Sequence, residues 1–150
     1  MDFVSIRVIT ADIGRLVAFY EKATGLPAAW ATEDFAEIRT PTATLAIGST
    51  RTVPLFTPDD PGSARPAANQ SVIVEFRVED VDQVYANLSL DPADLVQKPT
   101  TMPWGNRSLL LRDPDGTLVN LFTPTTPITP PTPTARAPRE ERGPSAETTR

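Results

Sequence analysis

Two parts of the chain repeat the same order of a strand pattern followed by a helix pattern. In residues 4–9 every second side chain is strongly apolar, which is the period of a strand with one buried face. Apolar side chains then recur at helical spacing, and this predicts a helix that begins after Asp12 and ends at Gly25. The same order returns at residues 72–78, followed by a second helix-opening residue, Asp80, which stands 68 residues after Asp12.

Three short strand patterns follow each helix pattern. The last two strands of the second half are joined by a turn, residues 113–116, in which proline restricts φ and glycine supplies a positive φ. Each half is therefore predicted to be a βαβββ module, and two copies of one such unit predict an α+β fold. The predicted strands are residues 28–31, 35–39 and 44–47 in the first half and 95–98, 108–111 and 118–122 in the second.

Composition divides the chain into one domain and a tail. Residues 1–124 form the predicted domain, with a first module at 1–56, a polar, proline-containing linker at 57–70, and a second module at 71–124. Residues 125–150 are rich in proline and threonine with one large apolar residue, so they cannot bury enough apolar surface to offset the entropy lost on ordering. We expect this tail to be disordered.

The charge and the missing residue types exclude several function classes. The net charge is −5, which argues against binding to nucleic acid or to an anionic membrane surface. The chain has no cysteine and no histidine, so it has no disulfides and none of the usual hydrolase triads. Neither a signal peptide nor a stretch long enough to span a bilayer is visible, and a soluble, cytoplasmic protein is expected.

The helix sequence DIGRLVAFYEKATGL and the final hairpin RDPDGTLVNLF resemble those of the vicinal oxygen chelate superfamily. That group includes glyoxalase I, extradiol dioxygenases, fosfomycin-resistance enzymes and bleomycin-resistance proteins. The resemblance implies that the two βαβββ modules pair into a curved mixed sheet around a cavity. It also implies a homodimer, since members cover their open sheet edges with a second chain.

Metal-dependent members of this superfamily usually take one ligand, most often His or Glu, from the first and last strand of each module. Carried over to this chain, those positions fall on Ser5, Ile47, Ile73 and Asn120. Two of these side chains are hydrocarbons, and the other two are weak neutral ligands for a divalent ion. We therefore expect no metal ion and no other cofactor.

The period of the strands indicates which other side chains line the cavity. Arg7 shares a face with Ser5, and Glu75 shares a face with Ile73, because residues two apart on a strand point the same way. Arg7 and Glu75 have two interpretations: an ion pair between the modules, or a polar floor that binds a ligand. By the same count, the last strand of the first module contributes Leu45 and Ile47 to the cavity lining. The last strand of the second module contributes Leu118, Asn120 and Phe122.

Trp104 lies in a Pro-Trp-Gly sequence, where a buried core ring is less expected. It either stacks on a planar ligand over the cavity or covers the edge of the sheet. The candidate ligand-binding residues are therefore Ser5, Arg7, Glu75, Trp104, Asn120 and Phe122.

The sequence favours a metal-free member of the superfamily that binds a small organic molecule. The alternative is an enzyme of the same superfamily, either a cofactor-independent or an atypical metal-dependent lyase, isomerase or dioxygenase. In that case Glu75 is the candidate general base and Arg7 its catalytic partner. The sequence does not identify the ligand.

Overall fold

The computed structural model describes residues 1–68 and 70–125, so the predicted disorder of the tail falls almost entirely outside the described residues. The first module contains β1 (Ser5–Thr10), α1 (Ile13–Thr24), β2 (Ala29–Thr32), β3 (Phe35–Arg39), β4 (Thr44–Ser49) and the short 3₁₀ helix η1 (Thr50–Leu55). The second contains β5 (Ile73–Arg77), α2 (Val81–Asn87), the 3₁₀ turn η2 (Pro92–Asp94), β6 (Leu95–Thr101), β7 (Asn106–Arg112) and β8 (Leu118–Pro124).

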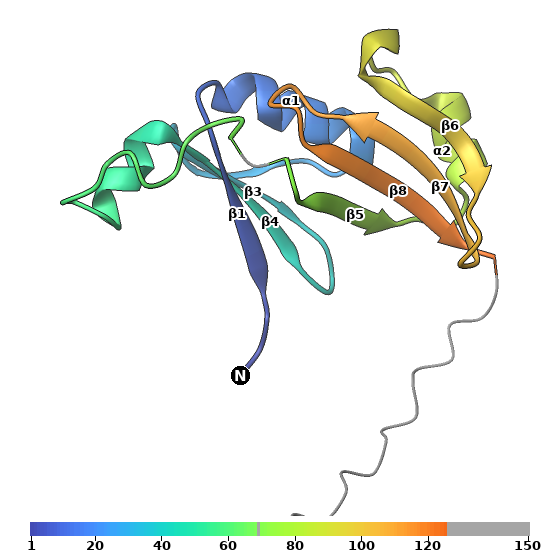
Figure 1. Cartoon of the computed structure of the whole chain (residues 1–150), viewed down its shortest axis with the longest axis horizontal. Helices are drawn as coiled ribbons and strands as arrows, with labels where there is room; N and C mark the ends of the chain where they lie inside the picture. The colour runs from blue at the N-terminus through green and yellow to red at the C-terminus, as the bar shows by residue number, and fades with distance from the viewer. Residues whose placement is uncertain (69, 126–150) are drawn as a thin grey trace, which may run out of the picture.

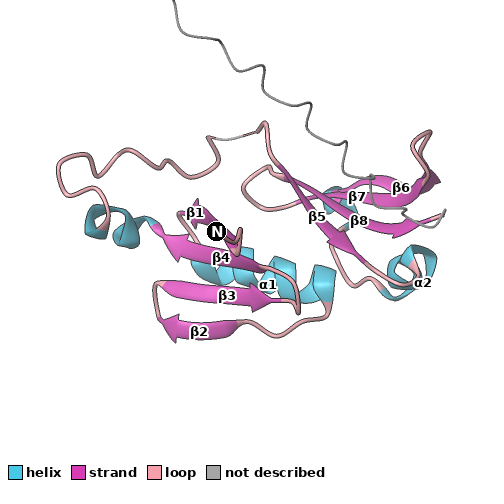
Figure 2. Ribbon diagram, turned by 90° about the horizontal axis from the view of Figure 1, so that it is seen from below, coloured by secondary structure: helices cyan, strands magenta, loops and turns pink. Residues whose placement is uncertain are grey.

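Each module forms its own four-stranded mixed sheet (Figures 1 and 2). The strand orders are β1-β4-β3-β2 and β5-β8-β7-β6, and in each sheet the first and last strands of the module run parallel while the other pairs are antiparallel. The predicted α+β fold with two βαβββ modules is confirmed. In each sheet the first strand of the module, β1 or β5, is an edge strand, and β1 and β5 are not hydrogen-bonded to each other.

The ends of α1 are formed by the residues that the sequence indicated. The Asp12 carboxylate accepts a hydrogen bond from the backbone N–H of Arg15 at 3.0 Å. Gly25 adopts a left-handed conformation with φ 70° and donates its N–H to the carbonyl of Glu21 at 2.9 Å. A residue with a side chain is strained at that φ, so glycine sets the length of this helix.

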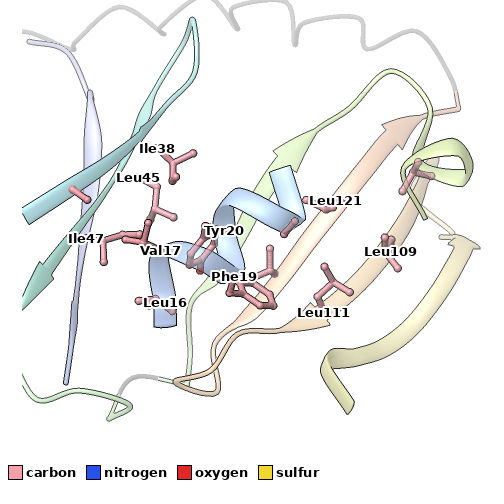
Figure 3. Close-up of a cluster of buried hydrophobic side chains, with 14 residues drawn as sticks. Leu16, Val17, Phe19, Tyr20, Ile38, Leu45, Ile47, Leu109, Leu111 and Leu121 are labelled. Carbon is pink, nitrogen blue, oxygen red and sulfur yellow. The ribbon is translucent and has the colours of Figure 1, made fainter. Parts of the chain in front are cut away.

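Helix α1 lies between the two sheets and supplies side chains to both (Figure 3). Leu16 and Val17 point toward the first sheet, and Phe19 and Tyr20 point toward the second. The resulting cluster is continuous from one module to the other, and its sheet residues are Ala36, Ile38, Leu45, Ile47, Leu109, Leu111, Val119 and Leu121. No helix among the described residues is long and apolar enough to cross a membrane.

One hydrogen bond joins the modules inside this core. The Tyr20 hydroxyl donates to Asp113 Oδ2 at 3.0 Å, and both residues are buried, with exposed fractions of 0% and 5%. Asp113 Oδ1 accepts from the backbone N–H groups of Asp115 and Thr117. Burial raises the pKa of the Asp113 carboxyl above its ordinary value, and burial followed by the nearby Asp113 charge raises the pKa of the Tyr20 hydroxyl.

The register between strands decides which side chains point away from this core. We call the side of each sheet that contacts the helices the helix face and the other side the open face. On the first sheet Arg7 pairs with Ala46, which pairs with Glu37, and all three lie on the open face. On the second sheet Glu75 pairs with Asn120, which also belongs to the open face.

The prediction that Leu45 and Ile47 line the cavity is wrong. Both side chains are buried in the core on the helix face of β4. Successive side chains of a strand point to opposite faces, so an error of one residue reverses the assignment. Arg7 and Glu75 are equivalent positions in the two modules. Arg7 pairs with Ala46, and Glu75 pairs with Asn120. The first-module counterpart of Asn120 is therefore Ala46 rather than Ile47.

Candidate functional site

The open face of the second sheet holds a small group of polar side chains. Asn120 donates from Nδ2 to Glu75 Oε1 at 2.8 Å, which joins two residues that the sequence had assigned to the same face. Asn120 Oδ1 and the hydroxyl of Ser108 on β7 are buried without a hydrogen-bond partner. Ser108 pairs with Phe122 and therefore lies on the same face. Buried polar atoms without a partner are rare and costly, so a donor that reached Asn120 Oδ1 after a shift of the side chains around it would be stabilised.

Arg7 occupies the corresponding position on the first sheet but has a different environment. Its guanidinium carbon lies 4.5 Å from the centre of the Phe35 ring and 4.8 Å from the centre of the Phe56 ring. A positive charge over an aromatic face is attracted to the electron-rich ring, which holds the guanidinium in place. Beside it is a hollow of about 300 Å³, lined by Arg7, Ile9, Val53, Phe56, Thr57, Ser63 and Ala64.

The structure does not bring Arg7 and Glu75 together within one chain. They lie on different sheets, and among residues 1–68 and 70–125 no ion pair joins them. The interpretation of the two residues as an intramolecular ion pair is therefore wrong for the single chain. The physical reason is that β1 and β5 do not pair with each other here, so their open faces do not share a sheet.

The remaining positions singled out in the sequence lie at strand ends, in a turn, or opposite Ser108 on the open face of the second sheet. Ser5 and Ile73 are exposed at the starts of β1 and β5, and Phe122 is half-buried on the open face of β8. Trp104 lies in the turn between β6 and β7 with 71% of its surface exposed. A role in binding for Ser5, Phe122 and Trp104 stays a prediction.

A larger hollow, of about 810 Å³, lies where the linker passes between β1 and the turn after β7. Its walls include Ile6 and Val8 from β1, Arg65 and Gln70 from the linker, and Asp113 and Asp115 from the turn. The sequence analysis did not find this hollow, because residues 57–70 carry no periodic pattern that would place them against a strand.

The side chains at the superfamily's ligand positions do not fit a divalent metal ion. With Ala46 in place of Ile47, the four positions offer a hydroxyl, a methyl group, a hydrocarbon chain and one amide. The amide nitrogen of Asn120 is already bonded to Glu75. Transition metals and zinc are held by imidazole, thiolate or several carboxylates. Within the part of the chain that the structure describes, no group of three or more His, Cys, Asp or Glu residues is placed to hold a metal.

Comparison with known proteins agrees with this architecture. Among curated proteins, the uncharacterized protein YraH of Bacillus subtilis is 26% identical over 125 residues, which cover 81% of this chain and 98% of YraH.

Solved structures with the same fold include a glyoxalase/bleomycin resistance protein/dioxygenase from Nocardioides, with a TM-score of 0.68 and 20% identity, which covers 88% of this chain and 89% of that one. A family enzyme from Burkholderia phytofirmans has a TM-score of 0.67 and 16% identity, over 82% and 98% of the two chains. These identities show the fold alone. The model of the glyoxalase/bleomycin resistance protein/dioxygenase superfamily matches residues 2–121, and the chain belongs to that superfamily.

Proposed function

We propose that the protein binds a small organic molecule on the open faces of its sheets and does so without a metal ion. The observation that carries this proposal is the pair of buried, unbonded oxygens, Asn120 Oδ1 and Ser108 Oγ, on the face that also carries the Glu75 carboxylate. A few convergent polar groups among apolar walls are typical of small-molecule sites. The donor set at the superfamily's ligand positions supports binding without a metal.

A screen for ligands by thermal shift tests this proposal. A compound that binds only the folded protein raises the melting temperature, and the increase grows with saturation. For compounds that bind the second sheet, Asn120→Leu should weaken binding about tenfold, because a hydrogen bond with a buried partner is worth about 1–3 kcal/mol. Isothermal titration calorimetry measures the change.

The matched control is Asn87→Leu, the same substitution at an exposed position at the end of α2. This variant should bind every compound as the unmodified protein does. If Asn120→Leu leaves the affinity of every hit unchanged, the open face of the second sheet is not the binding site. Elemental analysis showing one metal ion per chain would contradict the metal-free part of the proposal.

Glu75 also supports a second candidate function, that of an enzyme. One carboxylate oxygen accepts the Asn120 amide, which orients the group, and the other oxygen has no partner among the described residues. A carboxylate held in this way can remove a proton from a bound substrate as a general base. Glu75→Gln keeps the shape of the side chain and removes the base. If the variant still turns over a hit compound at the unmodified rate, Glu75 is not the general base.

We further propose that a second copy of the chain covers the free edges of β1 and β5. Exposed apolar side chains gather there, with Ile6 43% and Ile73 51% exposed and Phe3 and Val4 just before β1. An edge strand with apolar side chains is a template for pairing with another chain. Pairing β1 of one copy with β5 of the other would also bring the positive Arg7 and the negative Glu75 onto neighbouring strands, twice by symmetry.

The size of the particle in solution tests the dimer. Light scattering after gel filtration should give about twice the chain mass of 16.3 kDa. Ile73→Lys should shift the protein to the monomer, because a charged side chain on an edge strand opposes pairing. Val96→Lys, on the edge strand β6 of the same sheet, is the control and should stay dimeric. A monomeric unmodified protein would refute the proposal.

A further inference from the structure

The surroundings of Arg7 indicate what kind of molecule the first sheet binds. Its guanidinium lies over the ring of Phe35, on β3, and over the ring of Phe56, which directly follows η1. Contacts with two rings hold the guanidinium in place and use none of its N–H groups as hydrogen-bond donors to an oxygen. The group is therefore positioned without being neutralised.

Two other arginines of the first module already have a carboxylate partner. Arg39 forms an ion pair with Glu37, and Arg51 forms one with Asp34. For Arg7, no carboxylate, carbonyl or hydroxyl among the described residues accepts a hydrogen bond, although the side chain is exposed enough to be reached. Arg7 thus keeps a free set of donors at a fixed place on the open face.

The hollow beside Arg7 is lined mainly by apolar side chains. Ile9 comes from β1, while Val53 and Phe56 come from η1 and the residue after it. The hydroxyl of Thr57 is occupied locally, because it donates to the chain at Val53 or Asp60 and lies 2.9 Å from the hydroxyl of Ser63. The volume of about 300 Å³ is at the lower end of the range for small-ligand pockets.

From these observations we infer that the first sheet binds a small organic carboxylate. The carboxylate pairs with the free edge of the Arg7 guanidinium, whose planar fork matches two carboxylate oxygens. The hydrocarbon part enters the hollow between β1 and η1. This inference rests on the proposed binding function and names the ligand class for one of the two open faces.

Hexanoate and hexanamide provide matched probes, since they share length and shape and differ in charge. Ligand-observed NMR with the full chain should show hexanoate binding at least tenfold more tightly than hexanamide. In ¹H–¹⁵N spectra, the Nε–H signal of Arg7 should move with hexanoate and stay in place with hexanamide. Equal binding of the two probes would overturn the inference.

Three variants test whether hexanoate binds at Arg7. Arg7→Gln should reduce hexanoate binding at least tenfold and leave hexanamide unchanged. Arg15→Gln removes one positive charge from an exposed position on α1 and should change nothing. Phe56→Leu keeps an apolar side chain but removes one of the two rings, and a loss of about threefold to fivefold is expected from the weaker cation–ring contact. If Arg15→Gln matches Arg7→Gln, general charge rather than this pocket explains the binding.

The outcomes separate this inference from the proposed function. If Asn120-dependent hits exist but none depends on Arg7, the carboxylate assignment fails while the binding function stands. If no compound binds either face, both fail. A third outcome concerns Glu75 of a second copy: if it already occupies Arg7, hexanoate binds only after Glu75→Gln, and the inference is overturned for the native protein.

Discussion

Replacing Tyr20 by alanine should lower the free energy of unfolding by about 3–5 kcal/mol, the usual cost of deleting a large buried aromatic side chain. The ring is 0% exposed and packs edge-to-face on Phe19, with ring centres 5.3 Å apart, and against Phe76 of the second sheet. The substitution leaves a cavity between the modules and removes the donor to Asp113. Chemical denaturation followed by circular dichroism measures the loss.

Tyr20→Phe separates the hydrogen bond from the packing. It keeps the ring and leaves Asp113 Oδ2 buried without its donor, so a loss of about 1.5–3 kcal/mol is expected for a hydrogen bond to a charged group. Tyr85→Phe is the control, because the Tyr85 hydroxyl makes no hydrogen bond among the described residues, and its stability should be unchanged. Equal effects of the two phenylalanine variants would show that the contact with Asp113 contributes nothing.

Leu111→Ala should destabilise the protein by about 2–5 kcal/mol, whereas Leu110→Ala should cost less than about 1 kcal/mol. The two residues are adjacent leucines on β7, so the same side chain is removed in both variants. Leu111 is completely buried on the helix face opposite Val119, and Leu110 is only partly buried on the open face opposite Asn120. The difference follows from the alternation of side chains along a strand.

This pair of variants tests the face assignment on which the proposed site on the second sheet depends. Urea denaturation of the two alanine variants and the unmodified protein gives the comparison, with the slope against urea as a check that the same cooperative unit unfolds. Similar losses for both would mean that the two faces of the second sheet are covered to the same extent. A larger loss for Leu110 would reverse the assignment and place Asn120 in the core.

The fold was predictable because its main signals are local. Alternation in residues 4–9 and 72–78, the acidic caps Asp12 and Asp80, and Gly25 at the end of α1 each depend on a few neighbouring residues. The same alternation put Glu75 and Asn120 on one face of the sheet, and the register of the parallel strands β5 and β8 makes them direct neighbours there.

Features that depend on distant segments were not predictable in the same way. β4 reads TLAIGS, in which polar and apolar residues do not alternate, and Leu45 through Ser49 are all buried, so the sequence could not show which side faces the helix. Phe56 reaches Arg7 from a segment with no periodic pattern. Asp113 meets Tyr20 across 93 residues, and only the packing of the two modules brings them together.

The position of α1 between the two sheets affects how the protein unfolds. A helix encoded in the first half of the chain provides part of the hydrophobic surface on which the second sheet rests. Neither half can lose its structure without exposing apolar area that belongs to the other, and cooperativity arises from such shared burial. We therefore expect the internal repeat, which resembles two independent units in sequence, to unfold in one cooperative transition.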